Sequence, residues 1–224
     1  MTALTFTRKK NPSFMLNCSR LTPDLLAGLS LQQIENLSLF KQKNSPKVSD
    51  VFAVSGTDTE NIRFKNSSAQ LGYIGYKMTS GSITVEGDAG DFLGANMQGG
   101  TLIVKGNTGE RVGDQMRRGL LLIDGNAGDY CGSRMIAGTI GVYGVTGKYA
   151  GFGMRRGTIL LKKQIPLHAT IQDCGTHTLP FLSLLLRSFQ PLDTLFNQIK
   201  SNRVQRYAGD LACNGNGEIL ILLD

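Results

Sequence analysis

MTSGSITVEGDAGDFLGAN, residues 78–96, opens the stretch that decides the fold. The same nineteen-residue pattern returns without a gap as MQGGTLIVKGNTGERVGDQ (97–115), MRRGLLLIDGNAGDYCGSR (116–134) and MIAGTIGVYGVTGKYAGFG (135–153), and it starts a fifth time as MRRGTILLKK (154–163). Methionine begins every copy, and glycines recur in four fixed columns, one of which is Gly81, Gly100, Gly119, Gly138 and Gly157. A fixed period near twenty residues is the signature of a solenoid.

Each copy contains one short aliphatic run that predicts a β-strand, at residues 83–85, 102–104, 121–123, 140–142 and 159–161. Alternate residues of a strand face opposite ways, so Ile83, Val85 and their counterparts predict two aliphatic ladders on one face. The glycines leave no room for a helix inside the repeat and suit tight bends. We therefore predict an all-β core formed by a right-handed parallel β-helix, in which about five coils at roughly 4.8 Å each make a rod about 24 Å long.

The repeat divides the chain into three predicted parts: a leader with two short helices (1–56), the glycine-rich β-helix (57–165), and a helical cap with a closing strand (166–224). The leader contains two predicted helix starts, one at Thr22 before Pro23 and one at the capping box from Ser30 to Gln33. We also predict a strand at residues 50–54, followed by a degenerate coil at 61–65. In the tail we expect a loop at 173–177, helices within 181–204 interrupted at Pro191, and a strand at 218–223. Both flanks would cover the open ends of the coil, which are otherwise unpaired sheet edges. The segment FLSLLL (181–186) is apolar on all sides, which fits burial against the coil or against a partner subunit.

Composition restricts the class of protein. The chain has 224 residues, 28 glycines and a formal net charge of +7, and this basic excess favours acidic partners. Its cysteines, Cys18, Cys131, Cys174 and Cys213, lie far apart without metal-type spacing, which predicts free thiols in a reducing compartment. No apolar run has the length of a membrane span, and the first residues lack the apolar core of a signal peptide, so we expect a cytoplasmic protein.

Several residues suggest chemistry, but each has a plainer structural explanation. The glycines resemble phosphate loops, yet they recur in every coil and no helix follows them. The methionines suit a repeated corner of the core better than a soft metal site, because no histidine or cysteine accompanies them. Cys174 and His177 could form a nucleophile and base, but they lie only three positions apart in sequence and the plainer interpretation is structural. We expect no catalytic residue and no metal ligand in this chain.

Basic residues beside the methionines are the strongest candidates for a binding site. Arg117-Arg118 and Arg155-Arg156 occupy the same position two coils apart, and Lys77 and Arg134 lie in adjoining columns. Arginine makes bidentate contacts with carboxylates and phosphates. The row predicts contact with an extended polyanion or an acidic subunit, although a solvated face is the alternative. Nucleic acid is disfavoured because the repeats have few aromatic residues on which bases could stack.

The repeat G-x-x-M-x-x-G-x-[IL]-x-[VIL] resembles the glycine-rich β-helix domain shared by glutamate synthase and by the C subunit of formylmethanofuran dehydrogenase. The flanks separate the two. LTPDLLAGLSLQQIENLSL (21–39), GDYCGSRMIAGTIGVYGVTG (128–147), DCGTHTLPFLSLLLRSF (173–189) and RYAGDLACNGNGEIL (206–220) are similar to the C subunit of the formyltransferase/hydrolase complex of methylotrophic bacteria. The likeness covers nearly the whole chain, with a shorter run of coils than the family's.

The resemblance implies a non-catalytic scaffold subunit. In such a complex, formyl groups pass from tetrahydromethanopterin to a methanofuran-type carrier and on to formate, and the implied partners are an amidohydrolase-like subunit that holds metal, a formyltransferase subunit and an accessory subunit. We expect no cofactor bound by this chain itself, although the anionic carrier tail would suit Arg117, Arg118, Arg134, Arg155 and Arg156. Two alternatives remain: a glutamate-synthase-like structural domain, and a free-standing enzyme that uses Cys174 and His177.

Overall fold

The computed structural model describes residues 2–10, 12–40, 45–166 and 168–223. Its strands are β1 (Ala3–Arg8), β2 (Leu16–Asn17), β3 (Phe52–Ser55), β4 (Asp58–Ser67), β5 (Leu71–Gly72), β6 (Ser82–Gly87), β7 (Gln98–Val104), β8 (Arg118–Ile123), β9 (Thr139–Val142), β10 (Thr158–Leu161), β11 (Gln172–Thr178), β12 (Arg203–Gly209) and β13 (Gly217–Leu222). The helices are α1 (Pro23–Leu26), α2 (Leu31–Glu35), α3 (Val48–Val51) and α4 (Pro180–Ser188), with 3₁₀ turns η1 (Leu195–Gln198) and η2 (Leu211–Cys213). Within the described residues, one mixed sheet orders its strands β11-β12-β13-β10-β9-β8-β7-β6-β4-β1-β3, and β2 pairs with β5. The protein is mostly β with few helices, as predicted.

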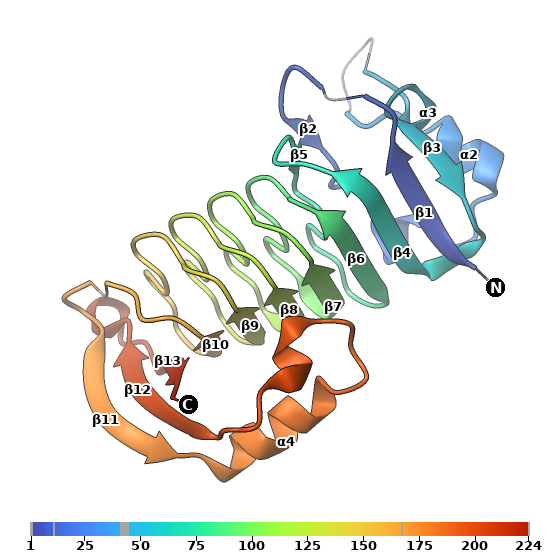
Figure 1. Ribbon diagram of the computed structural model, residues 1–224. Coiled ribbons are helices and arrows are strands. Elements are labelled where there is room, and N and C mark those ends of the chain that lie inside the picture. Colours follow the sequence, from blue (N-terminus) through green and yellow to red (C-terminus); the bar gives the residue numbers. More distant parts are fainter. Residues whose placement is uncertain (1, 11, 41–44, 167, 224) are drawn as a thin grey trace.

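The repeats stack on one another in register. Strands β6 to β10 pair in parallel, so that Ile83 lies beside Leu102, and Leu102 beside Leu121. The segments between the strands pair as well, since the amide of Gly94 donates to the carbonyl of Ile74 and that of Gly113 to the carbonyl of Leu93, each at 2.8 Å. Figure 1 shows the result as a row of similar turns between the N-terminal and C-terminal strands.

The interior of the stack holds the predicted aliphatic ladders. Ile83 and Val85 are fully buried, as are their counterparts Leu102 and Val104, Leu121 and Ile123, Ile140 and Val142, and Ile159 and Leu161. The five methionines that open the repeats, Met78, Met97, Met116, Met135 and Met154, are also fully buried. Burying each aliphatic side chain contributes about 1.5–3 kcal/mol, so these columns dominate the stability of the coil.

Glycine is required by the backbone at the corner after each methionine. Gly119 has φ +102°, and a β-carbon there would lie 2.8 Å from the Gly100 carbonyl oxygen and 2.9 Å from Cε of Met97. The equivalent position Gly138 has φ +103°, and a β-carbon there would lie 3.0 Å from Cε of Met116. Each methionine methyl group therefore fills the space that a side chain at the next corner would need, and the two columns depend on each other.

The leader covers the first turn. Strand β1 lies between β3, to which it is antiparallel, and β4, to which it is parallel, and β4 in turn pairs with β6. Phe6, Phe52 and Phe64 pack together beneath this end, with ring centroids 5.3–6.0 Å apart. The predicted capping box opens α2: Gln33 N donates to Ser30 Oγ at 3.3 Å and Ser30 N to Gln33 Oε1 at 2.8 Å.

The tail covers the last turn and then folds back along the sheet. Strand β13 extends the parallel stack beside β10, and β12 and β11 add antiparallel strands at the sheet's edge. Helix α4 and turn η1 form a second core against the outer face of the sheet, where Phe196 packs over Gly141 and beside Tyr143. This explains why a glycine replaces an aliphatic residue in strand β9.

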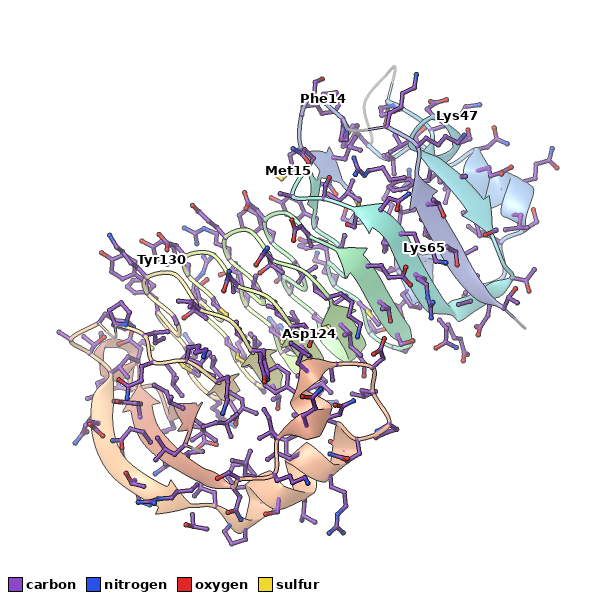
Figure 2. The ribbon with its side chains drawn as sticks, in the orientation of Figure 1. Phe14, Met15, Lys47, Lys65, Asp124 and Tyr130 are labelled. Carbon is purple, nitrogen blue, oxygen red and sulfur yellow. The ribbon has the colours of Figure 1, made fainter. Side chains whose placement is uncertain are left out.

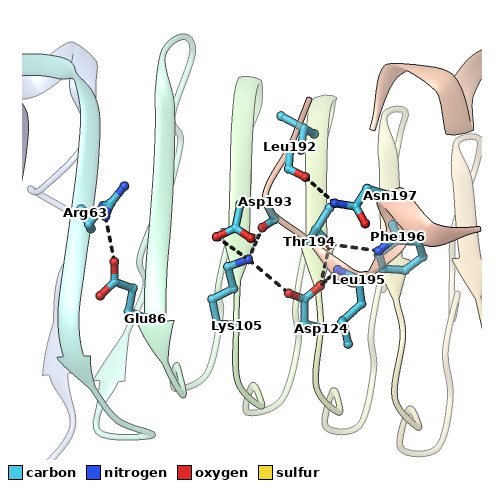
Figure 3. Close-up of polar contacts among 10 residues, drawn as sticks. All are labelled: Arg63, Glu86, Lys105, Asp124, Leu192, Asp193, Thr194, Leu195, Phe196 and Asn197. Atoms are coloured by element: carbon cyan, nitrogen blue, oxygen red, sulfur yellow. Dashed lines mark hydrogen bonds and ion pairs between the residues drawn. The ribbon is translucent and has the colours of Figure 1, made fainter. Parts of the chain in front are cut away.

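Polar contacts attach this tail to the middle of the sheet (Figure 3). Asp124, which follows β8, accepts hydrogen bonds from Thr194 Oγ1 at 2.5 Å and from Leu195 N at 2.9 Å. Lys105, which follows β7, lies 3.5 Å from the Asp124 carboxylate and 2.9 Å from that of Asp193. The Asp124 side chain is only 7% exposed, and these donors stabilise its buried carboxylate.

Four local predictions were wrong. Residues 50–51 lie in helix α3 rather than in a strand, which begins only at Phe52. Thr22 makes no side-chain cap on α1. Residues 173–177 lie in strand β11 instead of a loop, because β11 pairs with β12. Strand β12 was not predicted, since only its first two residues, 203–204, fall in the predicted helical stretch and no strand was expected after them. The segment 181–202 does contain a helix and a short turn on either side of Pro191.

Candidate functional site

The two arginine pairs lie on one edge of the stack, which we name the arginine edge and define as Arg117, Arg118, Arg155 and Arg156. Backbone hydrogen bonds of 2.8 Å join Arg117 to Met97, Ile136 to Met116 and Arg155 to Met135, so the pairs occupy alternate turns of the same column. All four arginines are exposed. At about 4.8 Å per turn, the pairs are about 10 Å apart.

The four guanidinium groups of the arginine edge are available for a ligand. Among the residues that the structure describes, none makes a hydrogen bond or an ion pair with them. Their planar donors suit bidentate contacts with carboxylate or phosphate groups. Four such charges without internal counterions give this edge a positive potential that attracts an anionic chain.

Arg134 lies beside the arginine edge but is engaged elsewhere. Its Nε and Nη2 atoms donate to the two carboxylate oxygens of Asp114 at 3.1 and 2.7 Å, and Ser133 Oγ donates to the same carboxylate at 2.6 Å. The Asp114 side chain is only 3% exposed, whereas that of Arg134 is 52% exposed. Arg134 therefore neutralises a buried charge first, and its contact with a ligand stays a prediction.

A hollow of about 380 Å³ adjoins the C-terminal end of the arginine edge, lined by Ile136, Arg155, Arg156, Cys213, Asn214 and Asn216. The tail forms its far wall, since Asn216 N donates to the Arg155 carbonyl oxygen at 2.7 Å. Sequence reasoning missed these asparagines, because they belong to the non-repeating tail and no periodic signal aligns them with the arginines.

A second hollow, of about 500 Å³, lies beside α1 at the first turn of the stack, lined by Ser19, Arg20, Thr22, Asp24, Leu25, Tyr76, Lys77 and Thr79. Lys77 Nζ lies 5.3 Å from the centre of the Tyr76 ring, and Arg20 Nη1 donates to the Ser38 carbonyl oxygen at 2.7 Å. The repeat pattern singled out Lys77, but Arg20 comes from the leader and was not predicted.

Asp24 joins helix α1 to the first turn beside this hollow. One carboxylate oxygen accepts from Thr79 N at 2.9 Å, and the other accepts from Ser80 Oγ at 2.9 Å and from Thr79 Oγ1. Burial by itself raises the pKa of this carboxyl group, but the hydrogen bonds from Thr79 and Ser80 outweigh it and the net pKa is lowered. Asp24 is therefore ionised at neutral pH, with its oxygens directed at donors of the turn.

Cys174 and His177 are not arranged as a nucleophile and base. Both lie in strand β11, where His177 Nε2 is 2.8 Å from the carbonyl oxygen of Cys174 and the Cys174 thiol contacts the Gln172 carbonyl oxygen at 3.7 Å. The neighbouring Asp173 accepts from Gly175 N at 2.7 Å, which stabilises the bulge in this strand. These contacts lie within strand β11 and stabilise its irregular backbone, so they fit the structural interpretation of Cys174 and His177.

An aromatic row runs along another corner of the turns and was also missed. Tyr73, Phe92, Arg111, Tyr130 and Tyr149 recur every nineteen residues, all with positive φ of 58–61°. The rings of Tyr73 and Phe92 stack at 4.8 Å, those of Tyr130 and Tyr149 at 5.0 Å, and Arg111 lies 4.8 Å from the centre of Tyr130. Figure 2 shows Tyr130 projecting from its turn. The rings cover one another's faces, so the row stabilises the corner itself.

Within the described residues, no group of three or more histidine, cysteine, aspartate or glutamate side chains is placed to hold a metal ion. Among the helices of the same part of the chain, none combines the length and hydropathy needed to cross a bilayer.

Comparison with known proteins gives the context for this site. No family model matches the chain. It is 32% identical to the C subunit of the tungsten-containing formylmethanofuran dehydrogenase 2 of Methanococcus maripaludis over 95 residues, which make up 42% of this chain and 35% of that protein. It is 33% identical over 73 residues to the Fhc C subunit of the formyltransferase/hydrolase complex of Methylorubrum extorquens, covering 33% of this chain and 28% of that protein. The alignments thus span about a third of the length of these curated relatives.

A solved structure extends the likeness over the whole chain. One chain of the formyltransferase/hydrolase complex (FhcABCD) from Methylorubrum extorquens, in complex with methylofuran, matches 98% of this chain and 100% of that chain. The TM-score is 0.64 at 30% sequence identity.

Proposed function

Because the chain belongs to the C-subunit family of formylmethanofuran dehydrogenases and formyltransferase/hydrolase complexes, we propose that it is the scaffold subunit of such a complex and carries no catalytic site of its own. The complex would move a formyl group from tetrahydromethanopterin to a methanofuran-type carrier and on to formate. Its partners would be an amidohydrolase-like subunit that holds metal, a formyltransferase subunit and an accessory subunit.

The observation that carries this proposal is the end-to-end structural match to a chain of a complex that contains methylofuran. The likeness includes both non-repeating ends, which a shared repeat alone would not require. Those ends also present apolar surface: on α4, Leu182 and Leu186 face the second core, whereas Phe181 and Leu184 are 44% and 68% exposed. An exposed apolar helix face fits contact with another subunit.

The arginine edge is the place on this chain that best suits an anionic carrier tail. Four guanidinium groups without partners among the described residues lie in two adjoining columns, and the hollow lined by Arg155 and Arg156 adjoins one end of this edge. In this proposal the scaffold guides the tail electrostatically while other subunits perform the chemistry. Such guidance weakens as salt is added, because exposed charges separated by more than about 8–10 Å are screened at physiological ionic strength.

Co-purification tests the scaffold role. The tagged full-length chain, expressed in its natural host, should elute with further subunits, and mass spectrometry would identify them. Leu184→Asp should reduce that recovery, while Ser183→Asp, at the neighbouring exposed position, serves as the matched control. A chain that elutes alone as a monomer contradicts the proposal.

A kinetic experiment tests carrier guidance. Arg117→Gln, Arg118→Gln, Arg155→Gln and Arg156→Gln combined should slow carrier turnover by the purified complex at low salt, with a smaller effect at high salt, and leave its assembly intact. The complex carrying Cys174→Ala should keep full activity. Unchanged kinetics in the quadruple variant would remove the arginine edge from the proposal, and loss of activity in Cys174→Ala would favour a catalytic role for that residue.

The same proposal includes the architecture of the scaffold, a right-handed parallel β-helix of residues 57–165 between a leader at 1–56 and a cap at 166–224. Its support is that the backbone groups of every segment of the turn, including those between the strands, pair about one repeat away. Right-handed crossovers are the rule for parallel strands. An experimental structure that showed these strands in an open sheet would contradict this.

A further inference from the structure

The last complete repeat, residues 135–153, departs from the turns before it at one position. Phe152 stands where Ala95, Asp114 and Ser133 stand in the three preceding turns. Those three residues are buried, whereas Phe152 is 47% exposed. A large apolar side chain thus replaces small or polar ones only in the turn where the position faces water, and packing of the repeat does not account for it.

Other apolar side chains gather around Phe152. Tyr149, on the same turn, is 42% exposed, and its ring centre lies 6.5 Å from that of Phe152. The ring of His168 comes from the tail and lies 5.9 Å from Phe152 and 6.5 Å from Tyr149. Leu211, 51% exposed, adjoins this group, because its amide donates to the carbonyl oxygen of Thr170 at 3.0 Å. We name Tyr149, Phe152, His168 and Leu211 the last-turn patch.

Hydrogen bonds hold the backbone beneath this patch in one arrangement. Asp210, only 2% exposed, accepts from Gly153 N of the last complete repeat and from Ala212 N of the tail, each at 2.9 Å. Thr170 Oγ1 lies 2.8 Å from His168 Nδ1, which orients the imidazole ring. The apolar groups of the patch are therefore preformed, and preformed groups lose less conformational entropy when a partner binds.

The patch is too small to make a stable interface by itself. An aromatic side chain buries about 150–250 Å² when it is fully covered, so two rings exposed by somewhat less than half offer roughly 130–230 Å². A standard interface takes about 800 Å² from each partner. The surface around the patch must therefore take part in any contact that the patch makes.

That surrounding surface presents two exposed cations. Lys148 belongs to the same repeat, and the amide of Arg134 donates to the Phe152 carbonyl oxygen at 2.7 Å. The carboxylates beside them are engaged within the stack: Asp129 is half-buried and accepts from the Lys148 amide at 2.7 Å, and the buried Asp114 pairs with Arg134. The charge that this surface presents to a partner is positive.

From this geometry we propose that the last-turn patch docks a different subunit of the complex, one that receives Phe152 in an apolar pocket and places carboxylates opposite Lys148 and Arg134. The inference rests on the proposed scaffold role and adds where a partner binds and what its surface is made of. A second copy of this chain does not fit, because a symmetric pair would bring the same cations face to face. An apolar anchor surrounded by polar contacts is the usual anatomy of a protein interface.

Photocrosslinking in the intact complex locates the partner. The tagged full-length chain would be expressed in its natural host with p-benzoylphenylalanine in place of Phe152, and mass spectrometry would identify the peptide joined to it after irradiation and digestion. We expect a peptide of another subunit, with an apolar residue and at least one aspartate or glutamate near the joined position. A crosslink to a second copy of this chain, to a peptide without acidic residues, or to nothing overturns the inference.

The dissociation constant between this chain and the identified subunit gives a second measure. Phe152→Ser should raise it about tenfold, because it removes the apolar anchor. The fold should tolerate this change, since Ser133 already occupies the equivalent position one turn earlier. Lys148→Glu should raise the constant about threefold at low salt and less at high salt. Lys10→Glu, the same charge change at an exposed position of the leader, should leave it unchanged.

These variants also separate the inference from the function on which it rests. If the unmodified chain elutes without other subunits, the proposed scaffold role fails. If it elutes with them but Phe152→Ser and Lys148→Glu both behave like Lys10→Glu, only the docking role of the last-turn patch is overturned.

Discussion

Replacing Gly119 by alanine should destabilise the protein through two separable effects. The residue has φ +102°, a conformation that costs an L-residue about 1–2 kcal/mol. The added methyl group would also lie 2.8 Å from the Gly100 carbonyl oxygen and 2.9 Å from Cε of Met97, which is fully buried. Overpacking of this kind costs about 1–3 kcal/mol. We therefore expect Gly119→Ala to lower the free energy of unfolding by about 2–5 kcal/mol.

Gly28 supplies the matched control. Its φ is also positive, at +77°, but a β-carbon there would meet nothing within 4 Å. Gly28→Ala should therefore show the backbone cost alone, about 1–2 kcal/mol. Urea unfolding followed by far-UV circular dichroism suits the comparison, because the chain has no tryptophan, and equal slopes against urea concentration would show that the unfolded states are comparable.

A double-mutant cycle then assigns the packing effect to its partner. Met97→Ala alone should cost about 2–5 kcal/mol by opening a cavity. The double variant that also carries Gly119→Ala should lose about 1 kcal/mol less than the sum of the two single-variant losses, because the new methyl group occupies space that the methionine vacates. If Gly119→Ala costs no more than Gly28→Ala, or if the two changes are additive, the dependence of the glycine column on the methionine column is refuted.

Three other predictions address charges and thiols. Asp114→Asn should lower the free energy of unfolding by about 2–3 kcal/mol, because a neutral amide cannot accept both bonds from the Arg134 guanidinium; a loss below about 0.5 kcal/mol in urea titration contradicts it. Burial raises the pKa of the Cys18 and Cys131 thiols to about 12, so the folded state keeps protons that unfolded thiols, with a pKa of 9.0, lose. The contribution of these two thiols to the free energy of unfolding should be constant below pH 9 and fall between pH 9 and 12. Replacing both cysteines with alanine should reduce the fall in the free energy of unfolding over that pH range. Asp124→Asn should speed amide hydrogen exchange in residues 194–198 about tenfold without changing exchange in β6, and equal acceleration in both would show global destabilisation instead.

The repeat was predictable because its structure depends on one local pattern. Once the period is known, each residue's neighbours lie one turn before and one turn after it, and alternation within the strand decides which side chains are interior. The ladders that contain Ile83 and Val85 were confirmed for this reason. The stacking of Arg117 and Arg155 in one column follows from the same period.

The ends resisted prediction because their pairing is not local. Strand β11 has an almost wholly exposed sequence, so it shows no alternation of polar and apolar residues, and it is a strand only because β12 lies beside it. Strand β12 in turn depends on β13, which continues the stack. Helix α3 is four residues long and ends where β3 begins, a boundary that propensity cannot locate.

By itself, the sequence determined the repeating turn, its interior and the alignment of the arginine pairs, because a nineteen-residue period places equivalent residues in equivalent surroundings. Only the tertiary structure decided which basic residues are free to bind. In the folded chain Arg134 forms an ion pair with the buried Asp114, and Arg20 of the leader lines the same hollow as Lys77 of the first turn. Both results come from how non-equivalent side chains pack and neutralise one another across the fold, and no period in the sequence encodes that.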